Sequence, residues 1–176
     1  MQKILLPLLS LIPFFLFGQN GHIVALGGRS NAVANASVAF HDINSTLSNQ
    51  AGLAKITQSG FVLASEQRFL LTELSSVGAG FALPTSSGTF GLSVQYFGSE
   101  SYNESKIGLA YGRKLAENFS LGVQFDVLNT RIAENGSKLL YTFEVGLQYE
   151  LIENVLIGIH IFNPVRLEII EAHIGV

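Results

Sequence analysis

The sequence lacks cysteine and tryptophan and has few charged residues, and each absence excludes a class of protein. Without cysteine the chain has no disulfides, no thiolate metal site and no lipid-modified cysteine at its start. Charged residues make up 13% of the chain, well below the share of about 25% in an average globular protein. The net charge is −3, and scattered Lys and Arg in a weakly acidic chain give no electrostatic basis for binding nucleic acid.

Long hydrophobic runs are absent after the first 18 residues, although the mean hydropathy is high, at +0.38. A transmembrane helix needs about 20 consecutive apolar residues, and no later stretch provides them. The apolar residues instead alternate with small or polar ones, which is typical of strands that face lipid on one side.

Residues 1–18 are predicted to be a cleaved signal peptide that directs the chain across the inner membrane. Lys3 supplies the positive start, and Ile4 to Phe17 is an apolar stretch of suitable length. An uncleaved membrane anchor is the alternative, but the span is short and contains two prolines.

The clearest alternation runs from Tyr141 to Asn163, in two arms separated by Glu153-Asn154. Successive side chains of a strand point to opposite faces, so we expect a hairpin with one apolar face and one polar or small face. The first arm has eleven residues. Tilted by about 40°, it would rise roughly 28 Å, close to the apolar band of a transmembrane barrel.

The same alternation predicts five strands upstream of this hairpin: Phe61–Leu70, Ser76–Leu83, Phe90–Tyr96, Lys106–Gly112 and Phe119–Val127. Together they give an all-β antiparallel meander of about seven strands within residues 60–176. The predicted connections are tight at Thr85–Gly88, Ala116–Asn118 and Glu153-Asn154, and longer at Ser99–Asn103 and Thr130–Leu140. Short periplasmic turns and longer outer loops are typical of outer-membrane barrels.

The small and polar residues of these strands are predicted to face the lumen of a transmembrane barrel. Candidate lumen-lining residues are Gln95, Gln124, Asp126, Glu144, Gln148 and His160. The alternative is a soluble secreted β-barrel that turns its apolar face inward and binds a small hydrophobic ligand. Soluble surfaces carry about 25–35% charged residues, which these strands do not provide, so we favour the membrane barrel.

Residues 19–59 lack the alternation and are rich in Gly, Ala, Asn and Ser. Small residues at this density let backbone pack against backbone, which suits a hatch that fills the barrel lumen; a flexible periplasmic tail is the alternative. Asp42 is expected to cap a short helix beginning near Ile43, with Gly52 closing it.

No arrangement of residues predicts an enzyme. His41-Asp42 is the one adjacent pair that suggests acid–base chemistry, and no Ser lies in a nucleophile elbow. Gly27-Gly28-Arg29 lacks the strand–turn–helix context of a phosphate-binding loop. We therefore predict no catalytic residues, no cofactor and no metal site.

The stretch from Gly27 to Ala54 resembles the start of the PorV/PorQ-like outer-membrane proteins, which are relatives of the FadL long-chain fatty-acid transporters. That family opens with a Gly-Ala-Arg-like run, a small-residue stretch, an Asp and then Asn-Pro-Ala-Gly-Leu. The matching residues here are Arg29, Asp42, Asn49, Ala51, Gly52 and Leu53, whereas Gln50 stands in place of the proline. Gly158 to Pro164 also resembles a strand end of the family.

The resemblance implies a barrel of about fourteen strands in the outer membrane of a Gram-negative bacterium. It implies transport of hydrophobic molecules across that membrane or a part in type nine protein secretion; a purely structural outer-membrane protein is the alternative. The implied partners are outer-membrane lipid, the barrel-assembly machinery, and hydrophobic small molecules or secretion-system proteins. Seven strands are half the implied number, and Ile174-Gly175-Val176 is not an aromatic barrel end, so we expect an incomplete barrel.

Overall fold

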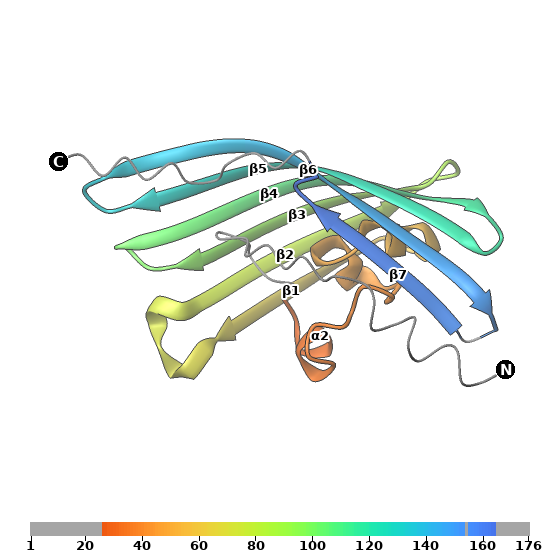
Figure 1. Ribbon diagram of the computed structural model, residues 1–176, viewed down its shortest axis with the longest axis horizontal. Coiled ribbons are helices and arrows are strands. Elements are labelled where there is room, and N and C mark those ends of the chain that lie inside the picture. Colours follow the sequence, from red (N-terminus) through yellow and green to blue (C-terminus); the bar gives the residue numbers. More distant parts are fainter. Residues whose placement is uncertain (1–25, 154, 165–176) are drawn as a thin grey trace, which may run out of the picture.

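The computed structural model describes residues 26–153 and 155–164, and most of their regular structure is β-strand (Figure 1). Seven antiparallel strands form one sheet, and each strand pairs with the next along the chain. They are β1 (Gly60–Gln67), β2 (Ser75–Pro84), β3 (Thr89–Gly98), β4 (Tyr102–Ala116), β5 (Phe119–Ile132), β6 (Gly136–Ile152) and β7 (Val155–Phe162). The predicted all-β antiparallel meander is confirmed. The predicted signal peptide lies outside the described residues.

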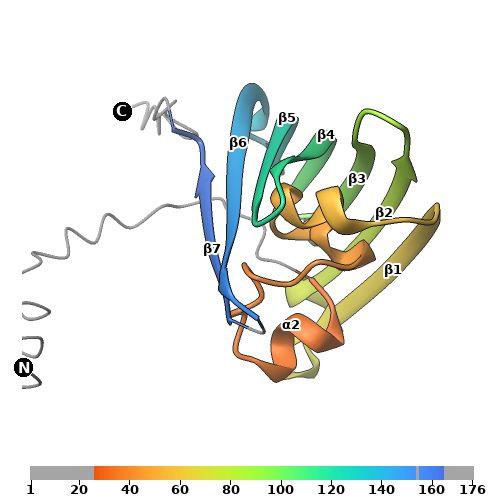
Figure 2. The ribbon, with the colours of Figure 1, turned by 90° about the vertical axis from the view of Figure 1, so that its right-hand side faces the viewer.

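The sheet is strongly curled and forms half of a barrel, with β1 and β7 at its two edges (Figure 2). β7 pairs only with the part of β6 from Glu144 to Ile152. Within the described residues, no further strand pairs with the outer edge of β1 or of β7. The described part of the chain is therefore an open half-barrel.

The longest strands, β4 to β6, extend further than the alternation predicted. The predicted loop Thr130–Leu140 is wrong over most of its length, because Thr130 pairs with Lys138 and Arg131 with Ser137. Polar side chains do not end an antiparallel ladder, since its hydrogen bonds join backbone groups. The turn is confined to 133–135, where the Asn135 N–H donates to the Ile132 carbonyl over 3.1 Å.

The predicted contrast between tight turns and long loops is correspondingly weaker. At the end where long loops were expected, 99–101 and 133–135 are as tight as the opposite turns, and only 68–74 is longer. That connection replaces the end of the predicted first strand with two short 3-10 helices, η3 (Arg68–Leu70) and η4 (Thr72–Leu74). Phe69 and Leu70 have φ values of 55° and 58°, which a strand cannot accommodate.

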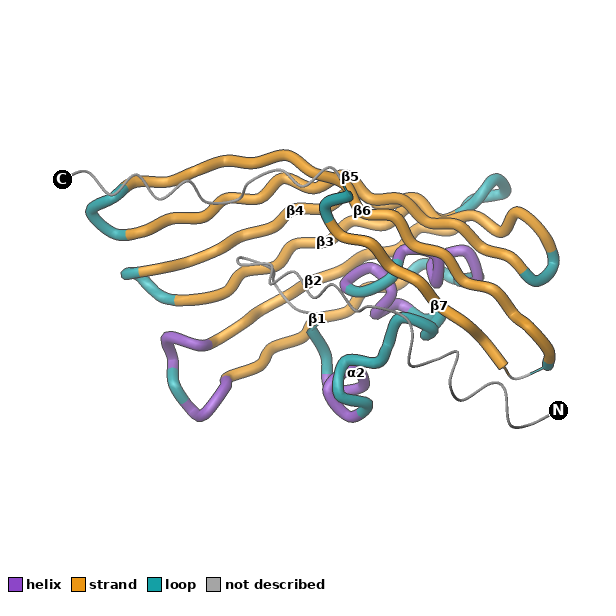
Figure 3. Tube along the Cα trace, viewed as in Figure 1, coloured by secondary structure: helices purple, strands orange, loops and turns teal. Residues whose placement is uncertain are grey.

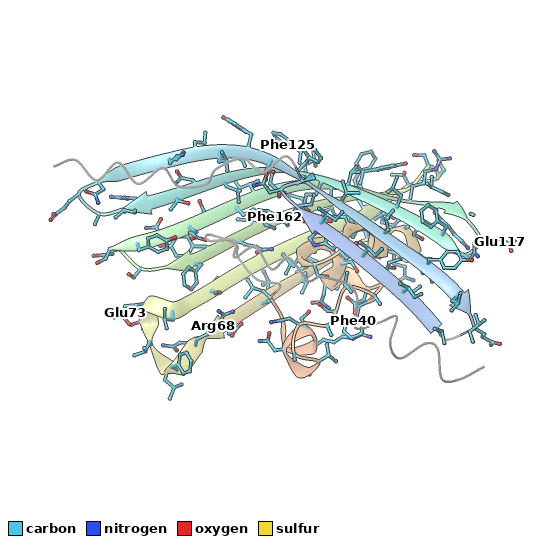
Figure 4. The ribbon with its side chains drawn as sticks, in the orientation of Figure 1. Phe40, Arg68, Glu73, Glu117, Phe125 and Phe162 are labelled. Atoms are coloured by element: carbon cyan, nitrogen blue, oxygen red, sulfur yellow. The ribbon has the colours of Figure 1, made fainter. Side chains whose placement is uncertain are left out.

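The convex side of the sheet, called the outer face from here on, is apolar and exposed. Leu63 on β1 is 73% exposed, Phe125 on β5 52% and Ile159 on β7 51%. The concave side, called the inner face, carries mainly small and polar residues, which are buried in the middle of β2 to β6 and half-buried on most of β1 and β7. In Figure 4, Phe125 extends from the outer face, whereas Phe162 at the end of β7 lies among the side chains of the inner face.

Residues 26–59, called the N-terminal segment from here on, contain three short helices joined by loops (Figure 3). They are α2 (Gly28–Ala32), η1 (Ile43–Leu47) and η2 (Gln50–Lys55). The two 3-10 helices pack against the inner face, η1 mainly on β2 and η2 on β4, β5 and β6. Leu53 of η2 is fully buried against Ala82 and Ala110, and this contact is the apolar centre of the molecule.

Local capping explains where these 3-10 helices begin. Asp42 accepts a 2.8 Å hydrogen bond from the Asn44 N–H at the start of η1, so the predicted cap is confirmed. Asn49 does the same for η2 by accepting from the Ala51 N–H over 3.1 Å. The prediction that Gly52 closes the first helix is wrong, because Gly52 lies inside η2. A Cβ there would collide with the Phe40 carbonyl and the Ser45 side chain.

Candidate functional site

The N-terminal segment approaches the inner face at positions where the strands carry glycine. A Cβ added at Gly122 would lie under 3.0 Å from the backbone of Gln50 and Ala51, and one added at Gly112 would lie 2.5 Å from the Gln50 carbonyl oxygen. At Gly146 the added atom would overlap the Asn49 side chain. Backbone and short side chains of the segment therefore fill the space that side chains of the strands would otherwise occupy.

Asn49 fixes the beginning of η2 to both the segment and the sheet. Its Nδ2 lies 2.6 Å from the Val38 carbonyl oxygen and 3.4 Å from the carbonyl oxygens of Leu147 and Ile159. Gln148 on β6 holds the same loop, because its Nε2 donates to the carbonyl oxygens of Val38 and Phe40 over 3.1 and 2.8 Å. Apart from the bond between Asn49 and Val38, these bonds join residues about a hundred positions apart in the chain.

Glu144 is the centre of the buried polar network of the inner face. Its Oε1 lies 2.8 Å from the Lys106 Nζ, and its Oε2 lies 2.9 Å from the His160 Nε2. The same Oε2 accepts a 2.6 Å hydrogen bond from the Gln50 Nε2 of the N-terminal segment. Glu144 thus joins β4, β7 and the segment through one carboxylate that is 1% exposed. A buried carboxylate requires such partners, because removing a charge from water is costly.

Gln124 and Asp126 on β5 continue the network. The Gln50 Nε2 lies 3.2 Å from the Gln124 Oε1, and the Gln124 Nε2 donates to the Asp126 Oδ1 over 2.8 Å. The Asp126 Oδ2 has no hydrogen-bond partner, and Asp126 is fully buried. A set of neighbouring polar groups therefore crosses the inner face from β7 to β5 beneath η2.

The buried charges do not balance. The charged side chains that are at most 7% exposed among the described residues are Glu104, Lys106, Asp126 and Glu144. Lys106 pairs with Glu144, and Glu104 accepts a hydrogen bond from the Tyr102 hydroxyl. Asp126 has no ion-pair partner among the described residues. The inner face therefore carries an excess of buried carboxylates over ammonium groups.

Two further ion pairs lie toward solvent. Arg29 pairs with the second carboxylate oxygen of Asp42, and its guanidinium lies 4.1 Å from the centroid of the Phe40 ring. The helix cap and this pair occupy both oxygens of Asp42, so the His41-Asp42 pair has a structural explanation. Lys55 pairs with Glu150 over 2.9 Å, and this pair joins the end of η2 to β6.

All six candidate lumen residues lie on the inner face, but they do not form one cluster. Gln124, Asp126, Glu144 and His160 share the network described above. Gln148 lies further along β6 with the loop at Val38, and Gln95 on β3 has no hydrogen-bond partner at either side-chain atom. Of the motif residues of the N-terminal segment, Asn49, Ala51, Gly52 and Leu53 are buried against the sheet, and Arg29 and Asp42 pair with each other.

Sequence reasoning missed Lys106 and the part played by Gln50. On the inner positions of β4, Lys106 lies between Glu104 and the small residues Gly108, Ala110 and Gly112, and a lysine at the start of such a run was the available signal. Gln50 drew notice only as a departure from proline, whereas its amide is the link between the segment and Glu144. Among the described residues, no group of three or more Asp, Glu or His side chains has the arrangement of a metal site.

Comparisons of the chain with protein-family models, with curated proteins and with solved structures give no match. In the described part of the chain, no helix has both the length and the apolar character of a membrane span.

Proposed function

We propose that this protein is an outer-membrane β-barrel protein of the PorV/FadL-like type, with the N-terminal segment as a plug in the lumen. The observation that carries the proposal is the outer face. Large apolar side chains from all seven strands are exposed there, and among them Phe61, Phe81, Phe125 and Phe143 are between 42% and 73% exposed. An apolar surface of this extent is stable against lipid and is a liability in water.

The inner face supports the same proposal from the other side of the strands. A soluble barrel that binds a hydrophobic ligand needs an apolar interior, but the inner positions carry Gln95, Gln124, Asp126 and Glu144. These groups are buried in a half-barrel that the N-terminal segment already fills, with contacts of backbone against glycine. The polar interior and the apolar exterior therefore favour a plugged membrane barrel over a soluble ligand carrier.

Two activities fit such a protein: passage of hydrophobic molecules across the outer membrane, and a part in type nine protein secretion. The inner face favours secretion, because an apolar molecule moving along it would meet buried carboxylates and amides that offer it no favourable contact. Its partners would then be outer-membrane lipid, the barrel-assembly machinery and secretion-system proteins.

Fractionation of cells that express the full chain tests the membrane assignment. We expect the protein in the outer-membrane fraction, released by detergent and not by high salt or carbonate. Recovery of folded protein in the soluble periplasm would overturn the proposal. In a deletion strain we expect defective secretion with normal fatty-acid uptake. The reverse result would indicate the transport activity, and loss of neither would indicate a structural role.

A further inference from the structure

We propose that Asp126 and Glu144 share one proton, which Asp126 carries, and that the loss of this proton loosens the N-terminal segment from the inner face. Docking of the segment would then weaken as the pH rises. The inference goes beyond the proposed function, because it concerns only groups of the inner face and does not depend on what covers the outer face.

The two carboxyl groups are diagonal neighbours on the inner face. The strand pairing sets Asp126 on β5 opposite Thr142 on β6, and Glu144 lies two positions further along β6 on the same face. The two side chains are in hydrogen-bond contact, and each is at most 1% exposed. Ionised carboxylates repel each other and neither can donate a hydrogen bond. The contact therefore requires a proton on one of them.

The hydrogen bonds around the pair assign the proton to Asp126. Both oxygens of Glu144 already accept, Oε1 from the Lys106 ammonium over 2.8 Å and Oε2 from the Gln50 amide over 2.6 Å. This is the pattern of an ionised carboxylate. Asp126 accepts one hydrogen bond, from Gln124 at Oδ1, and no donor reaches its Oδ2. Asp126 thus has an oxygen that can carry the proton.

The inner face around the pair supplies a single ammonium group. The charged, titratable and amide side chains that the neighbouring elements place there are Gln50, Gln95, Glu104, Lys106 and His160. Lys106 and His160 both bond to Glu144. Glu104 accepts a hydrogen bond from the Tyr102 hydroxyl, which lies two residues before it on β4.

With the proton on Asp126, the charges of this cluster cancel. The Lys106 ammonium balances the Glu144 carboxylate, and His160 can donate to Glu144 as the neutral tautomer that carries hydrogen on Nε2. Loss of the Asp126 proton leaves two adjacent carboxylates beside one ammonium. A buried charge without a partner is costly, so the ionised pair favours a rearrangement that admits water.

The N-terminal segment is bonded to both halves of the pair. The Gln50 Nε2 donates to Glu144 and also lies 3.2 Å from the Gln124 Oε1. Gln124 in turn donates to Asp126. Repulsion between two ionised carboxylates would separate the acceptors that the Gln50 amide bridges, and the segment would lose this anchor. His160, whose side chain is 19% exposed, is the most exposed member of the cluster and offers the proton a path to solvent.

Infrared spectroscopy of the full chain in detergent micelles tests the shared proton. At about pH 6 exposed carboxyl groups are ionised, because their ordinary pKa values are about 4, so the C=O stretching band of a protonated carboxyl group reports a buried one. We expect this band in the parent protein, its loss as the pH rises, and no band in Asp126→Asn. Absence of the band in the parent protein would overturn the proposal, because Asp126 would then be ionised.

Trypsin cleavage after Lys55, the last residue of η2, tests the coupling to the segment. The rate at each pH would be divided by the rate for an unstructured peptide with the sequence of residues 50–59, which removes the pH response of trypsin itself. We expect this ratio to rise as the infrared band disappears, by up to about tenfold per pH unit for one proton. A ratio that stays constant while the band disappears would overturn the coupling.

Two variants and a control assign the effect to Asp126. Asp126→Asn offers an N–H to Glu144 in place of the O–H, so the ratio should stay constant as the pH rises; a full response there would overturn the proposal. His160→Gln keeps a donor for Glu144 without the imidazole and should respond like the parent protein. Loss of the response in His160→Gln would place the proton on His160 instead. Glu73→Gln changes an exposed carboxyl group outside the sheet and should leave the band and the ratio unchanged.

Discussion

The outer and inner faces of the sheet belong to the same strands and the same backbone ladder, yet they depend on opposite properties of their side chains. On the outer face the residues are large, apolar and exposed, and no protein group in the described chain packs over them. On the inner face they are mainly small or polar, and in the middle of the sheet they are buried, several of them directly against the N-terminal segment. The outer face thus requires hydrophobicity without a specific shape, whereas the inner face requires specific shape and hydrogen bonding.

This comparison predicts which substitutions each face tolerates. One apolar residue can replace another on the outer face, because lipid adapts to its shape, but a charge there has no partner. A single added methyl group on the inner face can displace the segment, because the contact is between backbone and glycine.

Removal of Lys106 should have the largest effect. Lys106→Met leaves Glu144 buried with only His160 and Gln50 as partners, and we expect the free energy of unfolding to fall by about 3–5 kcal/mol. Urea unfolding followed by circular dichroism measures the change. The double variant Lys106→Met/Glu144→Leu should recover most of the loss, because it removes both charges. A single variant as stable as the parent would contradict the buried pair.

A charge introduced on the outer face should have the second-largest effect on stability. Val123 on β5 lies on that face and is 44% exposed, so Val123→Lys should cost about 2–4 kcal/mol if it lies near the middle of a lipid bilayer. Insertion into lipid vesicles, scored by the heat-dependent shift of the folded band on gels, measures it. Val123→Leu is the matched control and should insert normally. Equal insertion of both variants would mean that this face does not meet lipid.

A larger side chain at the adjacent inner position, Gly122, should cost less stability and should be detected by proteolysis of the N-terminal segment. Gly122→Leu places atoms where the backbone of Gln50 and Ala51 lies, and such overpacking costs about 1–3 kcal/mol. We expect trypsin to cleave faster after Lys55 while the strand signal in circular dichroism stays the same. If the rate of cleavage after Lys55 matches that of Val123→Leu, the segment is not held at Gly122.

The exposed ion pair should matter least. Lys55 and Glu150 lie 2.9 Å apart, but their side chains are 23% and 39% exposed, and water screens such pairs strongly. Lys55→Gln should leave the unfolding midpoint unchanged within error in the same urea experiment. A loss as large as that of Lys106→Met would show that the end of η2 is held more by this pair than by its buried contacts.

The faces of the strands could be predicted from the sequence because alternation is a local property. Gln124 and Glu144 were placed on the inner side from their neighbours alone, and the structure agrees. The cap at Asp42 was equally local, because donor and acceptor lie two residues apart. The pairing of Lys106 with Glu144 was not predictable, since it joins β4 to β6 across β5 and depends on the register of both pairings.

The predicted ends of strands and helices were partly wrong for a related reason. The ladder of β5 and β6 continues through Thr130, Arg131 and Lys138, where side-chain alternation gives no signal but backbone hydrogen bonding persists. The prediction that Gly52 ends the first helix was wrong because the segment folds as two capped 3-10 helices instead of one helix. Contacts with the inner face determine the conformation of the segment, and those contacts cannot be inferred from neighbouring residues in the sequence.

The hydrogen bonds of Asn49 and Gln148, which join positions about a hundred residues apart, set an order of assembly. The N-terminal segment precedes every strand of the described sheet, but its partners on β6 and β7 lie about a hundred residues further along the chain. Loop closure over such a distance is slow and costs chain entropy. The segment therefore gains these partners only after β6 and β7 have joined the sheet, and we expect its docking on the inner face to be a late step of folding.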